Sequence, residues 1–122
     1  MIEPALPHRG EVWLVDFNPG RGHEQSGVRP ALVIQSNLIN QTGFGTTVIL
    51  AISKLNEVKR RGVLNVCIKK GEGGLAVDSV IKCHQIYTID TGRLIKRFGI
   101  LTDSRMKEVE EAVKIVFGFI KF

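Results

Sequence analysis

The feature that most restricts the fold of this chain is a series of short apolar segments, rich in β-branched and aromatic residues and separated by turn residues. Segments of this length and composition, bounded by glycine, proline and asparagine, predict β-strands. They occupy residues 10–17, 31–35, 46–53, 63–68, 78–90 and 99–101. A chain built from such strands must bury their apolar faces in a small sheet or barrel.

One amphipathic helix is predicted near the end of the chain. Thr102 or Asp103 can cap it, and its acidic residues precede its basic ones, the order that the helix dipole favours. Apolar residues follow at spacings of three and four: Met106, Val109, Val113, Val116, Phe117 and Ile120. The predicted fold is therefore α+β and mainly β, a small and largely antiparallel β-barrel or strongly bent sheet with a C-terminal helix packed on it.

The connections between the strands carry different signals. Residues 18–28 hold three glycines and a proline, which is long for a hairpin and indicates a functional loop. Residues 36–45 and 91–98 can each include a short helical turn. Residues 54–62 are basic, and they predict either a solvated surface loop or an arm that follows RNA phosphates. Residues 69–75 form a glycine-rich turn without the Gly-Lys-Ser/Thr ending of a phosphate-binding loop.

Length and charge restrict the class of protein. A chain of 122 residues predicts one domain, residues 1–122. Lysine and arginine number 17 against 12 aspartates and glutamates, a net charge of +5, which favours a nucleic acid or an acidic protein as partner, although a mildly basic surface is also common without such a role.

The two cysteines and the single tryptophan are expected in the interior of the protein. Cys67 and Cys83 lie in apolar stretches without metal-ligand spacing, so both are expected as reduced core residues of a cytoplasmic protein. Trp13 is expected in the core, with a base-stacking platform as the alternative. No signal peptide and no run of eighteen apolar residues is readable.

The densest set of reactive side chains lies where the 18–28 loop enters the following strand. Arg29 stands at this junction, and its planar guanidinium matches the oxygens of a phosphate. A purely structural pairing of Arg29 with Glu24 is the alternative. In the 78–90 segment Lys82 and His84 alternate onto one face, which predicts either a polar outer face or a basic strip that binds a ligand.

Several segments, in this order, carry a family resemblance. They are Arg9-Gly10-Glu11-Val12-Trp13, Gly22-His23-Glu24-Gln25, Gly27-Val28-Arg29-Pro30-Ala31-Leu32-Val33-Ile34, Asp78-Ser79-Val80, and Gln85 with Thr88-Ile89-Asp90. Together they resemble the MazF/PemK/Kid family of toxins, the ribonuclease components of bacterial toxin–antitoxin pairs. The resemblance covers nearly the whole chain, and its Gly-x-Glu-Gln-x-Gly-x-Arg-Pro segment is specific.

The resemblance implies a fold, an activity and partners. The fold is an SH3-like barrel of the Kid, MazF and CcdB type, expected as a homodimer in the cytoplasm. The activity is cleavage of single-stranded RNA, with messenger RNA as the expected target, at a short sequence and without a metal or other cofactor, which stops translation and growth. The partner is a cognate antitoxin whose acidic C-terminal tail covers the substrate groove, and the toxin–antitoxin complex is expected to bind DNA.

Such cleavage uses the ribose 2′-hydroxyl as nucleophile and leaves a 2′,3′-cyclic phosphate and a 5′-hydroxyl, so it needs a base, an acid and donors for the phosphate. Arg29 is the expected donor. Ser53 matches a family position where a threonine often helps to hold the phosphate, and serine keeps the hydroxyl but loses the methyl group that restricts its rotamer. His23 and Glu24 are both candidate general bases, although His23 could instead contact the phosphate and Glu24 could instead orient Arg29.

Four residues are expected to bind the substrate: Gln25, Lys82, His84 and Gln85. Kid-like members place an arginine and an aspartate where Lys82 and His84 stand, so His84 is expected to read a base or bind phosphate rather than act as an acid. Gln85 suits reading of an exposed base edge. Two alternatives are a non-enzymatic gyrase-poison toxin of the same fold, which would not need Arg29 and Ser53, and a cleavage-deficient RNA-binding module.

Overall fold

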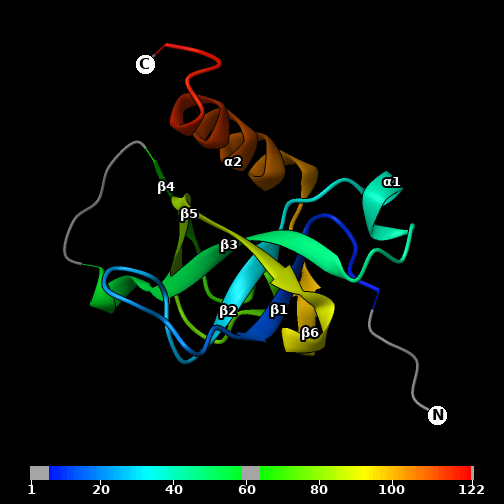
Figure 1. Cartoon of the computed structure of the whole chain (residues 1–122). Helices are drawn as coiled ribbons and strands as arrows, with labels where there is room; N and C mark the ends of the chain where they lie inside the picture. The colour runs from blue at the N-terminus through cyan, green and yellow to red at the C-terminus, as the bar shows by residue number, and fades with distance from the viewer. Residues whose placement is uncertain (1–5, 59–63, 122) are drawn as a thin grey trace.

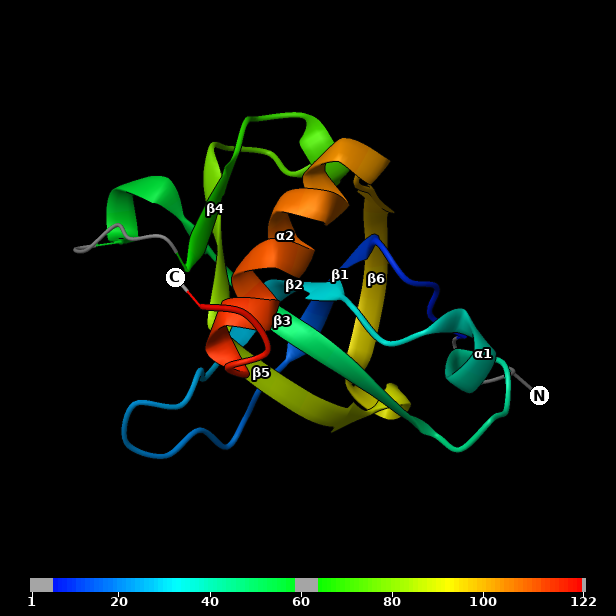
Figure 2. The same ribbon diagram turned by 90° about the horizontal axis from the view of Figure 1, so that it is seen from above.

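The protein, described here by a computed structural model over residues 6–58 and 64–121, is built on one six-stranded antiparallel sheet (Figure 1). The strand order is β4-β5-β3-β2-β1-β6. The strands are β1 (Glu11–Asp16), β2 (Val28–Val33), β3 (Thr46–Lys54), β4 (Asn65–Ile68), β5 (Ser79–Asp90) and β6 (Leu94–Ile100). Helix α2 (Asp103–Val116) lies across one face of the sheet (Figures 1 and 2). The predicted mainly β, α+β class with a C-terminal helix is confirmed.

The barrel is open. Within the described residues β4 and β6 are the two edges of the sheet and do not pair with each other. The 3-10 turn η2 (Glu72–Gly74) packs against β6 instead. A Cβ atom on Gly74, whose φ is +75°, would lie 2.1 Å from the carbonyl oxygen of Phe98, so this close approach of two backbones requires glycine.

Several strand and helix limits differ from the predictions, and the strand predicted over 31–35 covers Val28–Val33. The strand expected over 99–101 begins at Leu94, because residues 94–100 pair with β1, and the short helix expected in 91–98 is only the 3-10 turn η3 (Thr91–Arg93). The turn expected in 36–45 is α1 (Asn37–Asn40), where the Ser36 hydroxyl accepts a hydrogen bond from Leu38 N. Residue 63, at the start of the strand predicted over 63–68, lies outside the described residues.

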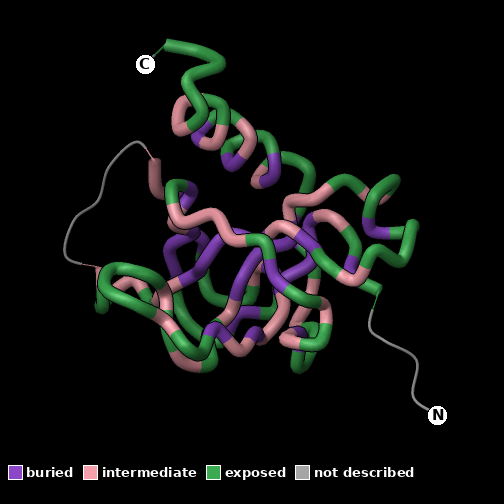
Figure 3. Tube along the Cα trace, in the orientation of Figure 1, coloured by how far each residue is buried: buried purple, intermediate pink, exposed green. Residues whose placement is uncertain are grey.

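The core consists of two clusters on opposite faces of the sheet, because neighbouring residues of a strand point to opposite faces. The first cluster lies under α2 and the second on the other face, and the purple stretches of Figure 3 mark the buried residues of both. Buried members of the first include Leu32, Leu50, Ile52, Ile81, Met106 and Val109; those of the second include Val15, Ala31, Val33, Ile49 and Ala51. Burying a side chain of this size stabilises the fold by roughly 1.5–3 kcal/mol.

Three of the predicted core positions are wrong. Phe117 and Ile120 are exposed, because α2 ends at Val116 and the chain beyond it no longer follows the helical spacing. Cys67 is exposed on the edge strand β4, where Val66 and Ile68 point inward and Cys67 points outward. Cys83 is buried as predicted, and burial raises the pKa of its thiol to about 12. Trp13 lies at the margin of the second cluster and is partly buried.

Arg105 joins α2 to η2 through Glu72. Arg105 Nε and Nη2 donate hydrogen bonds to the two carboxylate oxygens of Glu72 at 2.9 and 3.1 Å, and Lys69 N donates to Glu72 Oε2 at 2.7 Å. These hydrogen bonds lower the pKa of the Glu72 carboxyl below its ordinary value of 4.5, and Arg105 has the largest effect. Their contribution to stability is therefore present above the pKa of the unfolded chain and is lost as the pH falls through the lower pKa of the folded state.

We expect the Glu72→Gln variant to be less stable than the wild type at neutral pH, and the difference to disappear in acid, where Glu72 of the wild type is also uncharged. Urea denaturation of both proteins from neutral pH downward measures this difference in the free energy of unfolding. Glu111→Gln is the matched control, because Glu111 is exposed on α2 and lies 3.7 Å from its lysine partner. A difference that stayed constant with pH would contradict the assignment.

None of the helices in residues 6–58 and 64–121 combines the length and the apolar character needed to cross a membrane.

Candidate functional site

Arg29 and Ser53 lie on neighbouring strands at one end of the sheet. The pairing of β2 with β3 ends at Ala31 and Ala51, and Arg29 and Ser53 each lie two residues beyond this last pair, Arg29 opposite Val15 of β1 and Ser53 opposite Val80 of β5. Both positions then share the face of the second core cluster, which contains Ala31 and Ala51. The Arg29 side chain is 44% exposed and Ser53 is half-buried, so neither is sealed inside the protein.

Lys82 reaches the same region from β5, on the other side of β3. Its Nζ donates a hydrogen bond of 2.7 Å to Gln25 Oε1, and Gln25 N donates one of 2.7 Å to the hydroxyl of Tyr87. Two contacts therefore attach the 18–28 loop to β5 at Gln25. The structure joins Lys82 and Gln25 by a hydrogen bond, and it places Arg29 and Ser53 on neighbouring strands just beyond the last residues that pair.

Two cations and one carboxylate face each other here. Partial burial lowers the pKa of the Lys82 ammonium, and the nearby Arg29 guanidinium lowers it further, whereas Glu57 has the opposite effect. Arg29 Nη1 lies 3.6 Å from Glu57 Oε2. The site keeps an excess of positive charge, which suits a bound phosphate.

Glu57 is the residue of this group that the sequence analysis missed. It belongs to the 3-10 turn η1 (Leu55–Glu57), which follows β3 directly. In the sequence it is the one acidic residue of the basic segment 54–62, and that isolated charge was the only available signal. The contact with Arg29 comes from strand pairing that the sequence does not display.

His23 and Glu24 lie on the exposed part of the loop. Glu24 Oε1 accepts a hydrogen bond from Arg21 N at 2.9 Å, which closes a turn within the loop. The alternative pairing of Arg29 with Glu24 is wrong, since among the residues that the structure describes the carboxylate beside Arg29 is that of Glu57. Glu24 instead borders, with Gln25 and residues 87–89 of β5 among others, a hollow of about 160 Å³.

The strand β5 is irregular where His84 and Gln85 lie. Leu50 of β3 is opposite Ile86, whereas Ile52 is opposite Ile81, so β5 contains extra residues between these pairs. Such bulges change the direction in which side chains point. His84 is exposed, and the buried Gln85 Oε1 accepts no hydrogen bond from the described residues. Within the same residues no group of three or more His, Cys, Asp or Glu side chains is placed to hold a metal ion.

Comparison with known proteins gives a family match and a close match in sequence. Residues 8–117 match the model of a family described as the PemK-like, MazF-like toxin of type II toxin–antitoxin systems. The chain is 39% identical over 113 residues to Endoribonuclease MazF of Staphylococcus saprophyticus, which covers 93% of this chain and 92% of that protein.

Two solved structures share the fold. One is MazF from Deinococcus radiodurans, with a TM-score of 0.79 and 23% identity over 93% of this chain and 98% of that chain. The other is an endoribonuclease from a mycobacterial species, in complex with its cognate antitoxin, with a TM-score of 0.76 and 18% identity over 93% of this chain and 97% of that chain. At these identities the likeness concerns the fold.

Proposed function

Because this chain belongs to the PemK-like, MazF-like toxin family of type II toxin–antitoxin systems and is by homology an endoribonuclease, we propose that Arg29 and Ser53 bind the phosphate at which it cuts RNA. The observation that supports the proposal is that β2 and β3 are neighbours whose pairing ends at Ala31 and Ala51, with Arg29 and Ser53 each two residues beyond it. Lys82 and its hydrogen bond to Gln25 add a second cation and a loop anchor beside them.

The proposed reaction needs no metal. The 2′-hydroxyl of the ribose attacks the adjacent phosphorus as a base takes its proton, and the bond to the 5′-oxygen breaks as an acid protonates that oxygen. The products are a 2′,3′-cyclic phosphate and a 5′-hydroxyl. Arg29 donates two N–H groups to the non-bridging oxygens, Ser53 donates its hydroxyl, and the Lys82 ammonium stabilises the charge that develops on the phosphate.

His23 and Glu24 remain the proposed proton-transfer groups. Both lie within two residues of Gln25, whose hydrogen bonds with Lys82 and Tyr87 attach the loop to β5. Imidazole and carboxylate groups are the side chains most often used for general acid–base catalysis. Gln25, His84 and Gln85 are the proposed contacts to the bases, and the unsatisfied Gln85 Oε1 supports this because a base amino group can donate to it.

The proposed substrate is single-stranded RNA, and in the cell it is messenger RNA in the cytoplasm. The proposed inhibitor is a cognate antitoxin with an acidic C-terminal tail. The net charge of +5 and the cations of the site would attract both polyanions. The mycobacterial structure that shares this fold contains a cognate antitoxin. A homodimer is proposed as well, since the open edges β4 and β6 leave strands available for pairing.

We expect Ser53→Ala to cut single-stranded RNA about 100-fold more slowly than the wild type, because a preorganised donor to the charged phosphate is lost. Ser53→Thr should retain most of the rate. The measurement is cleavage of a fluorescent RNA in EDTA, with labelling of the new 5′-hydroxyl ends. Ser104→Ala is the matched control, since Ser104 is exposed on α2.

Other outcomes of this assay would overturn the proposal. Equal rates for Ser53→Ala and Ser104→Ala would remove Ser53 from the site. Intact RNA together with trapped gyrase–DNA adducts would favour the gyrase-poison alternative. RNA that is bound by the wild type but never cut would favour the cleavage-deficient binding module.

A further inference from the structure

The 18–28 loop carries the two proposed proton-transfer groups, His23 and Glu24. Within the part of the chain that the structure describes, the hydrogen bonds that join residues 19–26 to segments outside the loop are both made by Gln25. The order of this part of the loop therefore depends on what holds Gln25.

The two hydrogen bonds of Gln25 differ in how firmly they fix the loop. Gln25 N donates one of 2.7 Å to the hydroxyl of Tyr87, and Lys82 Nζ donates one of 2.7 Å to Gln25 Oε1. The bond from Lys82 joins the ends of two long side chains, which lose rotamer freedom when they make it. The bond to Tyr87 involves the backbone of the loop, so it holds Gln25 whether or not Lys82 turns to the phosphate.

The Tyr87 ring is itself held in one orientation. Tyr87 is opposite Ile49 of β3 and packs against the second core cluster. Its ring meets the ring of the buried Phe17 edge to face, with the ring centroids 5.3 Å apart and an angle of 69° between the ring planes. Phe17 N also donates a hydrogen bond of 2.9 Å to the carbonyl oxygen of Gly27 at the base of the loop. The Tyr87 hydroxyl therefore gives the loop backbone a fixed point of attachment.

The attachment at Tyr87 lies next to the reactive part of the loop. Glu24, Gln25 and Tyr87 all border the hollow of about 160 Å³ described above. His23 and Glu24 are exposed, and the hydrogen bonds of Glu24 within the described residues are made to Arg21 of the same loop. The position of both groups is therefore set by the loop backbone that Gln25 joins to Tyr87.

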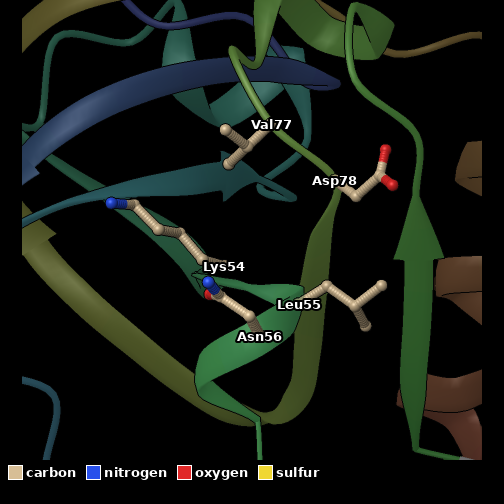
Figure 4. Close-up of a pocket in the computed structure, with 5 residues that line it drawn as sticks. All are labelled: Lys54, Leu55, Asn56, Val77 and Asp78. Carbon is tan, nitrogen blue, oxygen red and sulfur yellow. The ribbon is translucent and has the colours of Figure 1, made fainter.

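The residues that follow Ser53 are held separately. A hollow of about 500 Å³ is lined by Lys54, Leu55, Asn56, Val77 and Asp78 (Figure 4). Leu55 N donates a hydrogen bond of 3.0 Å to the carbonyl oxygen of Asp78, which joins the two walls of this hollow. Among the described residues, none of the lining comes from the 18–28 loop. Loss of the Tyr87 hydroxyl should therefore leave this side of the site unchanged.

We propose that Tyr87 is a positioning residue for RNA cleavage, whose hydroxyl holds the backbone of Gln25 and thereby keeps His23 and Glu24 in place for proton transfer. The inference rests on the proposed function, because it requires that groups of the 18–28 loop act at the cleaved bond. A residue that does not touch the substrate can change a rate by about tenfold or more when it sets the position of a reacting group.

The first test uses Tyr87→Phe, which keeps the ring and its contact with Phe17 and removes only the hydroxyl. Cleavage in EDTA of one fluorescent single-stranded RNA that the wild type cuts, over a range of RNA concentrations, gives kcat and KM separately. We expect kcat to fall about tenfold, while KM and the thermal midpoint stay close to the wild type, because Arg29 and Ser53 are unaffected. Thr46→Val is the matched control, since it removes a hydroxyl from the exposed start of β3, and it should leave kcat unchanged.

Limited digestion with trypsin measures the order of the loop without RNA. Arg21 is the residue of the loop after which trypsin can cut, since the bond after Arg29 precedes Pro30 and resists the enzyme. In Tyr87→Phe we expect cutting after Arg21 to be about threefold faster or more than in the wild type, because a loop that has lost an attachment opens more often. Mass spectrometry of the fragments measures this rate, and Thr46→Val should match the wild type.

The inference fails in any of three cases. Equal kcat for Tyr87→Phe and the wild type would show that cleavage does not depend on the hydroxyl. A higher KM with unchanged kcat would mean that the hydroxyl contacts the RNA rather than the loop. A fall in kcat without faster cutting after Arg21, or with a clear fall in the thermal midpoint, would assign the effect to the chemistry or to folding. Failure of the proposed function is recognised separately, because Ser53→Ala would then cut RNA as fast as the wild type, whatever the effect of Tyr87→Phe.

Discussion

Arg29→Ala is expected to cut RNA about 1,000-fold more slowly than the wild type, the largest effect we expect from a single substitution in this protein. The substitution removes the positive charge of Arg29 and the two N–H groups that it donates to the phosphate. The neighbouring Lys82 cannot replace them, because its pKa is lowered and it lacks a planar pair of donors. Arg29 is exposed at the start of β2, so the thermal midpoint should stay within a few degrees of the wild type.

Two further variants separate geometry from charge. Arg29→Lys keeps the positive charge but not the planar pair of N–H donors, and we expect it to recover only part of the cleavage rate. Arg21→Ala removes an exposed arginine from the neighbouring loop and should cut nearly as fast as the wild type. Single-turnover cleavage of one fluorescent RNA in EDTA measures all three. Arg29→Ala cutting as fast as Arg21→Ala would rule out Arg29 as the phosphate-binding residue.

Glu11→Ala is expected to lower the free energy of unfolding by about 2–3 kcal/mol, because a buried carboxylate that accepts several hydrogen bonds is removed. Glu11 is 6% exposed on β1. Its Oε1 accepts hydrogen bonds from His8 N at 2.7 Å and Trp13 Nε1 at 3.1 Å, and its Oε2 accepts one from Arg97 Nε. The Arg97 side chain is half-exposed and can donate its hydrogen bond to water instead, which limits the loss of stability. The N–H groups of His8 and Trp13 are left without an equally good acceptor.

Urea denaturation at neutral pH measures this loss, and the midpoint of thermal unfolding should fall by roughly 10 °C. Glu111→Ala, at an exposed position of α2, should change the free energy of unfolding by less than about 0.5 kcal/mol. A loss of the same small size for Glu11→Ala would mean that its hydrogen bonds merely replace equivalent bonds to water.

The sequence predicted the elements whose patterns are local. The β-branched, aromatic and aliphatic composition of β1 and β3, the partial alternation of β5 and the cap at Thr102 are properties of neighbouring residues, and the structure confirms the strands and the start of α2 within a few residues. The end of α2 and the length of β6 were predicted less well. Each depends on a partner elsewhere in the chain: β6 extends back to Leu94 because β1 pairs with it along that length.

The sequence by itself determined the family, the α+β class and the candidates Arg29 and Ser53, because these follow from residue types in a fixed order. Only the tertiary structure decided which groups meet: Arg29 with Glu57 rather than Glu24, and Lys82 with Gln25. The physical reason is that such contacts depend on how strands far apart in the chain pair, and a shift of one residue in pairing would turn Arg29 or Lys82 to the opposite face of the sheet.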